Sequence, residues 1–187
     1  MRGVAEACEE FDVYPLGGDT TRAGALTVDV SILGALSASP LLRSGARPGD
    51  LLALTGELGA SEVGLLVLQR GERVPERLVR KHLRPEPRVE VWLAAARLGV
   101  HAAVDISDGL ASDARRISEM SGVGCRVELD LLPVADDTSR FAEAMGHDPE
   151  TLTATGGEDY ELLLAAPSGP WRIYLRSPRS RSRSWAR

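Results

Sequence analysis

Residues 102–117 of the chain read AAVDISDGLASDARRI. An apolar run followed by a helical pattern predicts a buried strand, a short turn and then a helix over 109–120. Two aspartates, Asp105 and Asp108, stand in the turn with Ser107 between them and a glycine directly after the second. Two carboxylates at a strand-to-helix turn indicate a site for a divalent cation or for a phosphorylated ligand.

Each aspartate also has a purely structural interpretation. For Asp108 this is the N-cap of the helix, and taken alone it is the better interpretation. Asp105 is harder to explain in this way, because it ends a strand that we expect to be buried, where a lone charge is costly. A bound cation would offset that cost. Ser107 and the backbone amides that open the helix are then placed to hold phosphate oxygens.

Two further turns combine glycine with acidic residues. They read GGDTTR at 17–22 and GGEDYEL at 156–162. Glycine allows the backbone to approach a ligand closely. Mg²⁺ takes oxygen ligands and commonly uses one or two protein carboxylates together with substrate phosphates, so Asp19 in the first turn is a third candidate ligand. Its structural alternative is an Asx-turn.

Composition narrows the class of protein. The chain has 187 residues, 43% of them hydrophobic and 26% charged, which is ordinary for a globular protein with its own core. No apolar run approaches the ~18 residues of a membrane span. Acids stand in the opening MRGVAEACEE where a signal peptide has its apolar core, so a cytoplasmic location is expected. The net charge of -5 combines a basic end, with six arginines and no acid from Ser168 on, and an acidic body of about -11 over 1–167, and this acidic body argues against nucleic acid as its partner.

Positive charge in this chain is almost entirely arginine. Lys81 is the single lysine, beside 21 arginines. Phosphate contacts must therefore fall to arginine, and Arg43 in the loop LLRSGARPGD is the candidate. Its structural alternative is a solvated loop arginine. The three histidines have no recognisable partners in the sequence, and no catalytic residue is assigned.

Helices and strands alternate irregularly along the chain. Helices are expected at 2–12, 59–70, 75–82, 89–99, 109–120 and 138–146. Strands are expected at 13–18, 26–36, 51–56, 102–107, 126–133 and 160–167. Neither GxGxxG nor GxxxxGK[ST] occurs. The pattern predicts an α+β fold with a mixed sheet.

Both ends of the chain look incomplete. The chain opens inside a helix–strand unit, and it closes on SPRSRSRSWAR, which has no apolar period and predicts a disordered basic tail. A truncated or frame-shifted copy of a longer protein would explain both ends.

Five blocks, in order, resemble thiamine-monophosphate kinases, which belong to the aminoimidazole-ribonucleotide synthetase superfamily. The blocks are GGDTTR, LLRSGARPGDLLALTGELGAS, HLRPEPR, AVDISDGLASD and TGGEDYELLLAAP. The resemblance implies ATP-dependent phosphorylation of thiamine monophosphate to thiamine diphosphate, with Mg²⁺, by a homodimer. It also implies that 1–38 are the last part of an N-terminal ATP-binding α/β domain. A mixed-sheet α+β domain then covers 39–168, followed by the Arg/Ser tail at 169–187.

The resemblance gives a role to each candidate residue. It assigns magnesium binding to three acids: Asp19, Asp105 and Asp108. Arg43 and Ser107 would contact ATP, and Glu158 would lie at the substrate, whose thiazolium ring is a cation. The acceptor is itself a phosphate, so no general base is needed, and the reaction depends on positioning and charge neutralisation.

Departures from the family keep other interpretations open. The family carries more metal-binding acids upstream, and an aromatic residue near its C-terminus that packs on the substrate, neither of which is matched here. Turnover by this chain alone is therefore expected to be poor or absent. The alternatives are another ATP-dependent synthetase of the superfamily, of the selenophosphate or hydrogenase-maturation type, and a non-catalytic Mg-nucleotide-binding remnant. RNA binding through the tail is the weakest alternative.

Overall fold

The structure is a computed structural model that describes residues 2–36, 39–71 and 75–168. The chain divides into two compact units, Met1–Ala35 and Leu36–Arg187. The expected tail at 169–187 lies outside the described residues. Within the described residues, no helix is long and apolar enough to cross a membrane.

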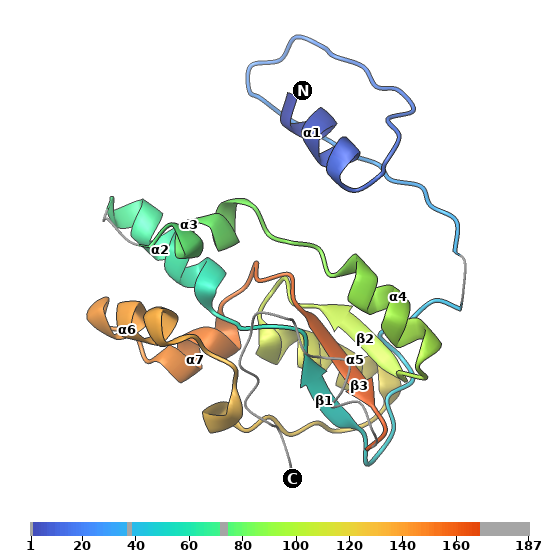
Figure 1. Cartoon of the computed structure of the whole chain (residues 1–187), viewed down its shortest axis with the longest axis vertical. Coiled ribbons are helices and arrows are strands. Elements are labelled where there is room, and N and C mark those ends of the chain that lie inside the picture. The colour runs from blue at the N-terminus through green and yellow to red at the C-terminus, as the bar shows by residue number, and fades with distance from the viewer. Residues whose placement is uncertain (1, 37–38, 72–74, 169–187) are drawn as a thin grey trace. The chain divides into compact units, whose positions relative to one another are not determined.

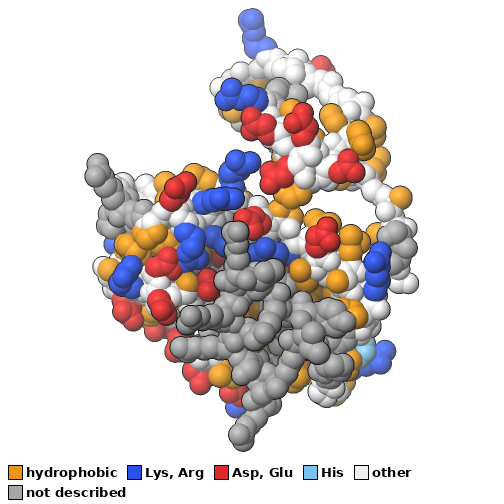
Figure 2. All heavy atoms as spheres, viewed as in Figure 1, with side chains coloured by type: hydrophobic (Ala, Val, Ile, Leu, Met, Phe, Trp, Pro, Cys, Tyr) orange, Lys and Arg blue, Asp and Glu red, His pale blue; other side chains and the backbone are white. Residues whose placement is uncertain are grey.

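The first unit contains one helix among its described residues, α1 (Arg2–Glu10), as predicted. The strands expected at 13–18 and 26–36 are absent. The alternating apolar side chains of the second segment are exposed, from 63% at Val30 to 95% at Leu26, and hydrophobic side chains lie open on this unit in Figure 2. The prediction was wrong because a strand needs a hydrogen-bonded neighbour, and the described part of this unit offers none.

The second unit is built on a sheet whose described strands are β1 (Leu51–Leu54), β2 (Ala102–Asp105) and β3 (Leu162–Ala166). Their order is β1-β3-β2, and both outer strands run antiparallel to β3. The α+β class is confirmed. The described sheet is antiparallel and not mixed, because β3 lies between β1 and β2 and runs in the opposite direction to both.

Two helices cover the two faces of this sheet, α4 (Val89–Arg97) on one side and α5 (Leu110–Ser121) on the other (Figure 1). Every residue of β3 is buried, because its odd-numbered side chains pack with α5 and its even-numbered ones with α4. Burial on both faces explains why β3 is a continuous apolar run, LLLAA, without alternation.

Four further helices gather at one end of the sheet around a core of their own (Figure 1). They are α2 (Ala60–Arg70), α3 (Glu76–Leu83), α6 (Asp136–Ala144) and α7 (Pro149–Thr155). Helix α7 was not predicted from the sequence. Its signal was Asp148 followed by proline: the Asp148 carboxylate accepts the N–H of Thr151 at 2.8 Å, and Pro149 occupies the first turn.

The strand predicted at 126–133 is also absent, and a short 3₁₀ helix, η1 (Leu129–Leu131), stands in its place. Val127 and Leu132 both pack against the α5 side of the core, although they lie on opposite faces of an extended chain. The 3₁₀ turn between them makes this possible, and it ends the alternation that predicted a strand.

A buried acid ties the ends of these elements together. Glu161 is 1% exposed at its side chain and sits next to the start of β3. Its carboxylate accepts hydrogen bonds from Lys81 (2.9 Å), from Arg88 (2.6 and 2.8 Å) and from the Thr55 hydroxyl (2.6 Å). Burial opposes ionisation of Glu161, but the Arg88 hydrogen bonds and the Lys81 charge outweigh it, so the pKa is lowered. The single lysine is thus committed to the fold.

A second buried acid, Asp159, holds the start of α2. Its carboxylate, with the residue only 2% exposed, accepts the backbone N–H groups of Gly59 at 2.7 Å and Ser61 at 3.2 Å. Burial raises the pKa of Asp159 to about 6, against the opposing effect of those two hydrogen bonds. The GGEDYEL turn is therefore fastened to two different parts of the fold.

Replacing Glu161 by glutamine is expected to destabilise the protein by about 3 kcal/mol, because it leaves two half-buried cations without their counter-charge. The matched control is Glu86→Gln. Glu86 also contacts Arg88, at 3.5 Å, but it is 59% exposed, so its loss should cost about 0.5 kcal/mol or less. Urea unfolding measures both. Equal losses for the two variants would contradict the role of Glu161.

Asp159 should make stability depend on pH in an unusual direction. Because its folded pKa of about 6 lies above its unfolded value of 3.8, its contribution is fully present below pH 3.8 and is lost as the pH rises through 6. The stability of the wild type relative to Asp159→Asn should therefore fall by about 2 kcal/mol between pH 4 and 7. Asp148 has a lowered pKa, because it accepts hydrogen bonds from Thr151, so Asp148→Asn should show the opposite slope. If the stability of the wild type relative to each variant changed with pH in the same direction, the role given to Asp159 would be contradicted.

Candidate functional site

The DISDG and GGEDYEL turns are joined by backbone hydrogen bonds that continue the β2–β3 pairing beyond the sheet. The N–H of Ile106 donates to the carbonyl of Glu161 at 2.8 Å, and the N–H of Tyr160 donates to Ile106 at 2.9 Å. The N–H of Glu158 donates to the carbonyl of Ser107 at 3.0 Å. Motifs about fifty residues apart in the chain are thus held side by side.

Two glycines allow this close approach. A Cβ atom on Gly157 would lie 2.5 Å from the carbonyl oxygen of Ser107. Gly109 has φ +95°, and a Cβ atom there would lie 2.5 Å from the carbonyl oxygen of Thr155. Any larger residue at either position would push backbone against backbone and separate the two turns.

The GGEDYEL turn stores backbone strain on both sides of its buried acid. Glu158 has φ 64° and Tyr160 has φ 51°, left-handed conformations that cost of order 1–3 kcal/mol each for residues with a side chain. The fastening of Asp159 to α2 holds them there. The Tyr160 hydroxyl donates to the Glu158 carboxylate at 3.2 Å, so the two strained residues contact each other.

The backbone amides of the DISDG turn are already occupied. One carboxylate oxygen of Asp113, a residue with 0% exposure, accepts the N–H of Ser107 at 3.0 Å and the N–H of Asp108 at 3.2 Å. These two amides precede the helix, which begins at Leu110, so the expectation that the amides opening the helix hold phosphate oxygens stays a prediction. A buried acid from inside α5 folds the turn back on the helix, much as the second half of a capping box does.

Asp108 does not cap the helix, so its structural interpretation was wrong. Gly109 is the N-cap residue, and no side chain caps it. The exposed Asp108 carboxylate forms an ion pair with Arg116, which also contacts Asp113. Hydrogen bonds to Asp108 and then to Asp113 raise the pKa of the Arg116 guanidinium.

Negative charge converges on this edge of the sheet. Burial raises the pKa of Tyr160, and the charges of Glu158, Asp105 and Asp108 raise it further. No group of three or more metal-binding side chains is present in the part of the chain that the structure describes. Two carboxylates in one turn nevertheless suit Mg²⁺, which completes its shell with phosphate and water. The Arg116 guanidinium on Asp108 shows that a cation is accommodated there.

A largely apolar pocket of about 530 Å³ opens beside these acids. Asp105 and Tyr160 line one side of it. The rest comes from Leu162 and from α4 with the segment before it, where Trp92 is the one further aromatic residue among the lining side chains. An apolar wall with a few convergent polar groups is typical of small-molecule sites.

The structure thus brings together four of the six predicted site residues, Asp105, Ser107, Asp108 and Glu158. Arg43 is not among them: its carbonyl and the following loop contact Ser121 at the end of α5, whereas Ser107 lies at the start of that helix. Twelve residues of helix separate the two points by about 18 Å. If both residues contact ATP, they contact different parts of it.

Asp19 belongs to the other compact unit. Its carboxylate accepts the N–H of the next residue, Thr20, at 2.7 Å, and its side chain is exposed. Its convergence with Asp105 and Asp108 stays a prediction.

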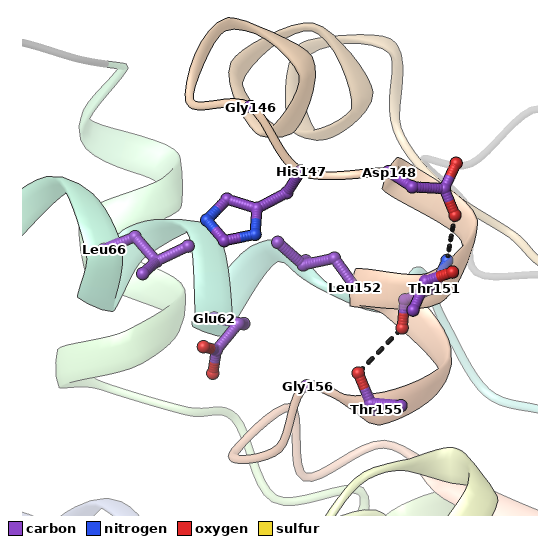
Figure 3. Close-up of a pocket in the computed structure, with 9 residues that line it drawn as sticks. All are labelled: Glu62, Leu66, Gly146, His147, Asp148, Thr151, Leu152, Thr155 and Gly156. Atoms are coloured by element: carbon purple, nitrogen blue, oxygen red, sulfur yellow. Dashed lines mark hydrogen bonds between the residues drawn. The ribbon is translucent and has the colours of Figure 1, made fainter.

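A smaller pocket of about 340 Å³ lies between α2, α7 and the connection from α6 (Figure 3). His147 points into the space between Leu66 and Leu152, with Glu62 on the α2 side (Figure 3). It shares Gly156 with the GGEDYEL turn, but none of the predicted site residues lines it.

Sequence reasoning missed three residues of the site. Asp113 belongs to the motif AVDISDGLASD and Tyr160 to the motif TGGEDYELLLAAP. The spacing of the residues in these motifs does not indicate which carboxylates are buried or that Tyr160 lines a pocket. Trp92 was assigned only to a helix. Its position over the pocket depends on how α4 packs on the sheet, which the local sequence does not reveal.

Known proteins are similar to this chain in sequence and in fold. A thiamine-monophosphate kinase of Methanopyrus kandleri is 40% identical over 166 residues, which cover 88% of this chain and 54% of the relative. One of Salmonella typhimurium is 42% identical over 165 residues, or 84% and 49%. The chain spans about half the length of the curated relatives it matches.

Solved structures agree with these relatives. The crystal structure of thiamine monophosphate kinase from Aquifex aeolicus matches with a TM-score of 0.67 at 33% identity, over 72% of this chain and 46% of that one. AaThiL complexed with AMPPCP and TMP matches with 0.64 at 35%, over 68% and 42%. The hydrogenase maturation protein HypE matches with 0.53 at 20%, over 72% and 40%, which shows the fold alone.

Residues 47–169, more than half of the chain, match the family described as AIR synthase related protein, C-terminal domain. This range contains both turns that form the site. The chain therefore belongs to the AIR synthase related protein family, through its C-terminal domain.

Proposed function

We propose that this chain takes part in the ATP-dependent phosphorylation of thiamine monophosphate to thiamine diphosphate. The observation that carries the proposal is the backbone pairing of the two turns, which gathers Asp105, Ser107, Asp108 and Glu158 at one edge of the sheet. Relatives of about 40% identity are named thiamine-monophosphate kinase, and the complex of AaThiL holds AMPPCP and TMP.

The acids of the DISDG turn would hold magnesium. Asp105 and Asp108 supply carboxylate oxygens, and Asp19 is the third proposed ligand. Bound magnesium would neutralise the phosphate charge that builds up as the γ-phosphoryl group is transferred. Ser107, whose backbone is fixed by Asp113 and by Glu158, would present its hydroxyl to ATP. Arg43 would contact ATP at a point remote from Ser107.

Glu158 and its neighbours would recognise the substrate. The thiazolium ring of thiamine monophosphate is a permanent cation, and Glu158 offers a negative charge beside the apolar pocket. A phosphate oxygen of the substrate attacks the γ-phosphorus and the β–γ bridging bond of ATP breaks, so ADP leaves. That acceptor oxygen is already deprotonated at neutral pH, so the chain needs no general base.

A homodimer and a cytoplasmic location complete the proposal. The exposed, alternating apolar side chains of residues 26–32 support pairing with another chain, since a strand of this composition needs a partner. The two cysteines, Cys8 and Cys125, are both free thiols, which suits a reducing compartment.

Two other functions remain in competition with this one. A hydrogenase-maturation type synthetase shares the fold, but its structural matches lie at 18–22% identity. A chain that binds Mg-nucleotide without turnover is the second. Identity of 32–42% to the kinases favours the first proposal over the synthetase, and the turnover assay below separates it from the second.

The test is the formation of thiamine diphosphate, followed by fluorescence after oxidation to thiochrome, with ADP release and Mg-ADP calorimetry in parallel. The full chain should phosphorylate thiamine monophosphate and no other acceptor in a panel, at a rate below that of a full-length relative. Asp105→Asn should weaken Mg-ADP binding about tenfold or more, because half of the paired carboxylate set is lost. The exposed Asp130→Asn is the matched control and should leave binding unchanged.

Each contrary outcome has a distinct meaning. Mg-ADP binding without thiamine diphosphate would overturn the kinase proposal in favour of a nucleotide-binding chain. Phosphorylation of a different acceptor would favour another synthetase of the superfamily. If Asp105→Asn binds Mg-ADP like the wild type, Asp105 is not a metal ligand.

A further inference from the structure

Arg116 connects two acids of very different character. One nitrogen of its guanidinium contacts Asp113, whose side chain is 0% exposed, and another contacts Asp108, whose side chain is 56% exposed. Arg116 itself is 37% exposed. The planar fork of arginine suits such a bridge, because its two outer nitrogens point to separate acceptors.

The two contacts differ in how easily they can be exchanged. Asp113 is fixed, since its other carboxylate oxygen accepts the N–H groups of Ser107 and Asp108. Asp108 faces solvent, and its side chain pairs with Arg116. When the guanidinium leaves Asp108 it can keep its contact with Asp113, so no buried acid is left unpaired.

We propose that Arg116 is the resident counter-ion of Asp108 and that a divalent cation must displace it to bind there. This inference rests on the proposed function, because it takes Asp108 as a metal ligand. In the free protein the positive charge of the guanidinium offsets the repulsion among the carboxylates of Asp105, Asp108 and Glu158. The DISDG turn can then keep one conformation without a bound metal ion. The arrangement lowers the affinity of the site for a free cation.

The test is titration of the full chain with Mn²⁺, with free Mn²⁺ measured by electron paramagnetic resonance. Arg116→Gln should bind Mn²⁺ about two- to fivefold more tightly than the wild type, since an exposed ion pair of ordinary strength no longer competes. Arg115→Gln is the matched control. Arg115 lies on the same helix and pairs with Glu119 at 3.5 Å. Its substitution therefore removes the same charge without changing a contact of Asp108.

A double-mutant cycle separates competition from general charge. In an Asp108→Asn background, Arg116→Gln should no longer change the Mn²⁺ affinity. Arg116→Lys, which keeps the charge and loses the fork, should fall between the wild type and Arg116→Gln. Thermal melts followed by circular dichroism check that each variant is folded. If Arg116→Gln is not folded, the comparison is made with Arg116→Lys.

The outcomes distinguish the role of Arg116 as a counter-ion from the role of Asp108 as a metal ligand. If Arg116→Gln and Arg115→Gln bind Mn²⁺ equally, or if Arg116→Gln binds it more weakly than the wild type, the counter-ion proposal is overturned while the metal site stands. If none of the proteins binds Mn²⁺, Asp108 is not a metal ligand, and the proposed function fails with it.

Discussion

The pairing of two short backbone segments beyond the ends of β2 and β3 is the constraint on which the site depends. It has three hydrogen bonds, between 2.8 and 3.0 Å, and it requires glycine at position 157, where any Cβ would meet the carbonyl of Ser107. The sheet alone would place Asp105 at a strand end facing water. The pairing adds Glu158 and Tyr160 from a distant part of the sequence, and so turns an exposed strand end into a site with two walls.

The acids of these motifs divide into two groups with different tasks. Asp113, Asp159 and Glu161 are buried, and each accepts hydrogen bonds from backbone amides, arginine or lysine. They hold the turns in place. Asp108 and Glu158 are exposed, and the half-buried Asp105 lines the apolar pocket, so a ligand can reach all three. Lys81 and Arg88 pair with the buried Glu161, whereas Arg116 pairs with the exposed Asp108.

Most of the second unit could be predicted from its sequence, because its helices and core strands have clear periodicity. The strands expected at 13–18 and 26–36 are absent because alternation predicts a side-chain pattern, but a strand exists only where a neighbour supplies hydrogen bonds. The strand expected at 126–133 is absent because the 3₁₀ turn at Leu129–Leu131 lets Val127 and Leu132 pack on the same side of the core. The site was predictable to the level of the motif. Which acid of GGEDYEL would be buried, and that Asp113 would occupy the amides of Ser107 and Asp108, depend on packing between segments far apart in the chain.

The central claim is that a divalent cation binds between the joined turns. Paramagnetic broadening by Mn²⁺ with AMPPCP, followed in the ¹⁵N-labelled full chain by NMR, tests it most directly. The account predicts that amide signals of residues 105–108 and 158–160 broaden at the lowest Mn²⁺ concentrations, while those around His147 in the smaller pocket stay sharp. Broadening centred on His147, with the two turns unaffected, would contradict it.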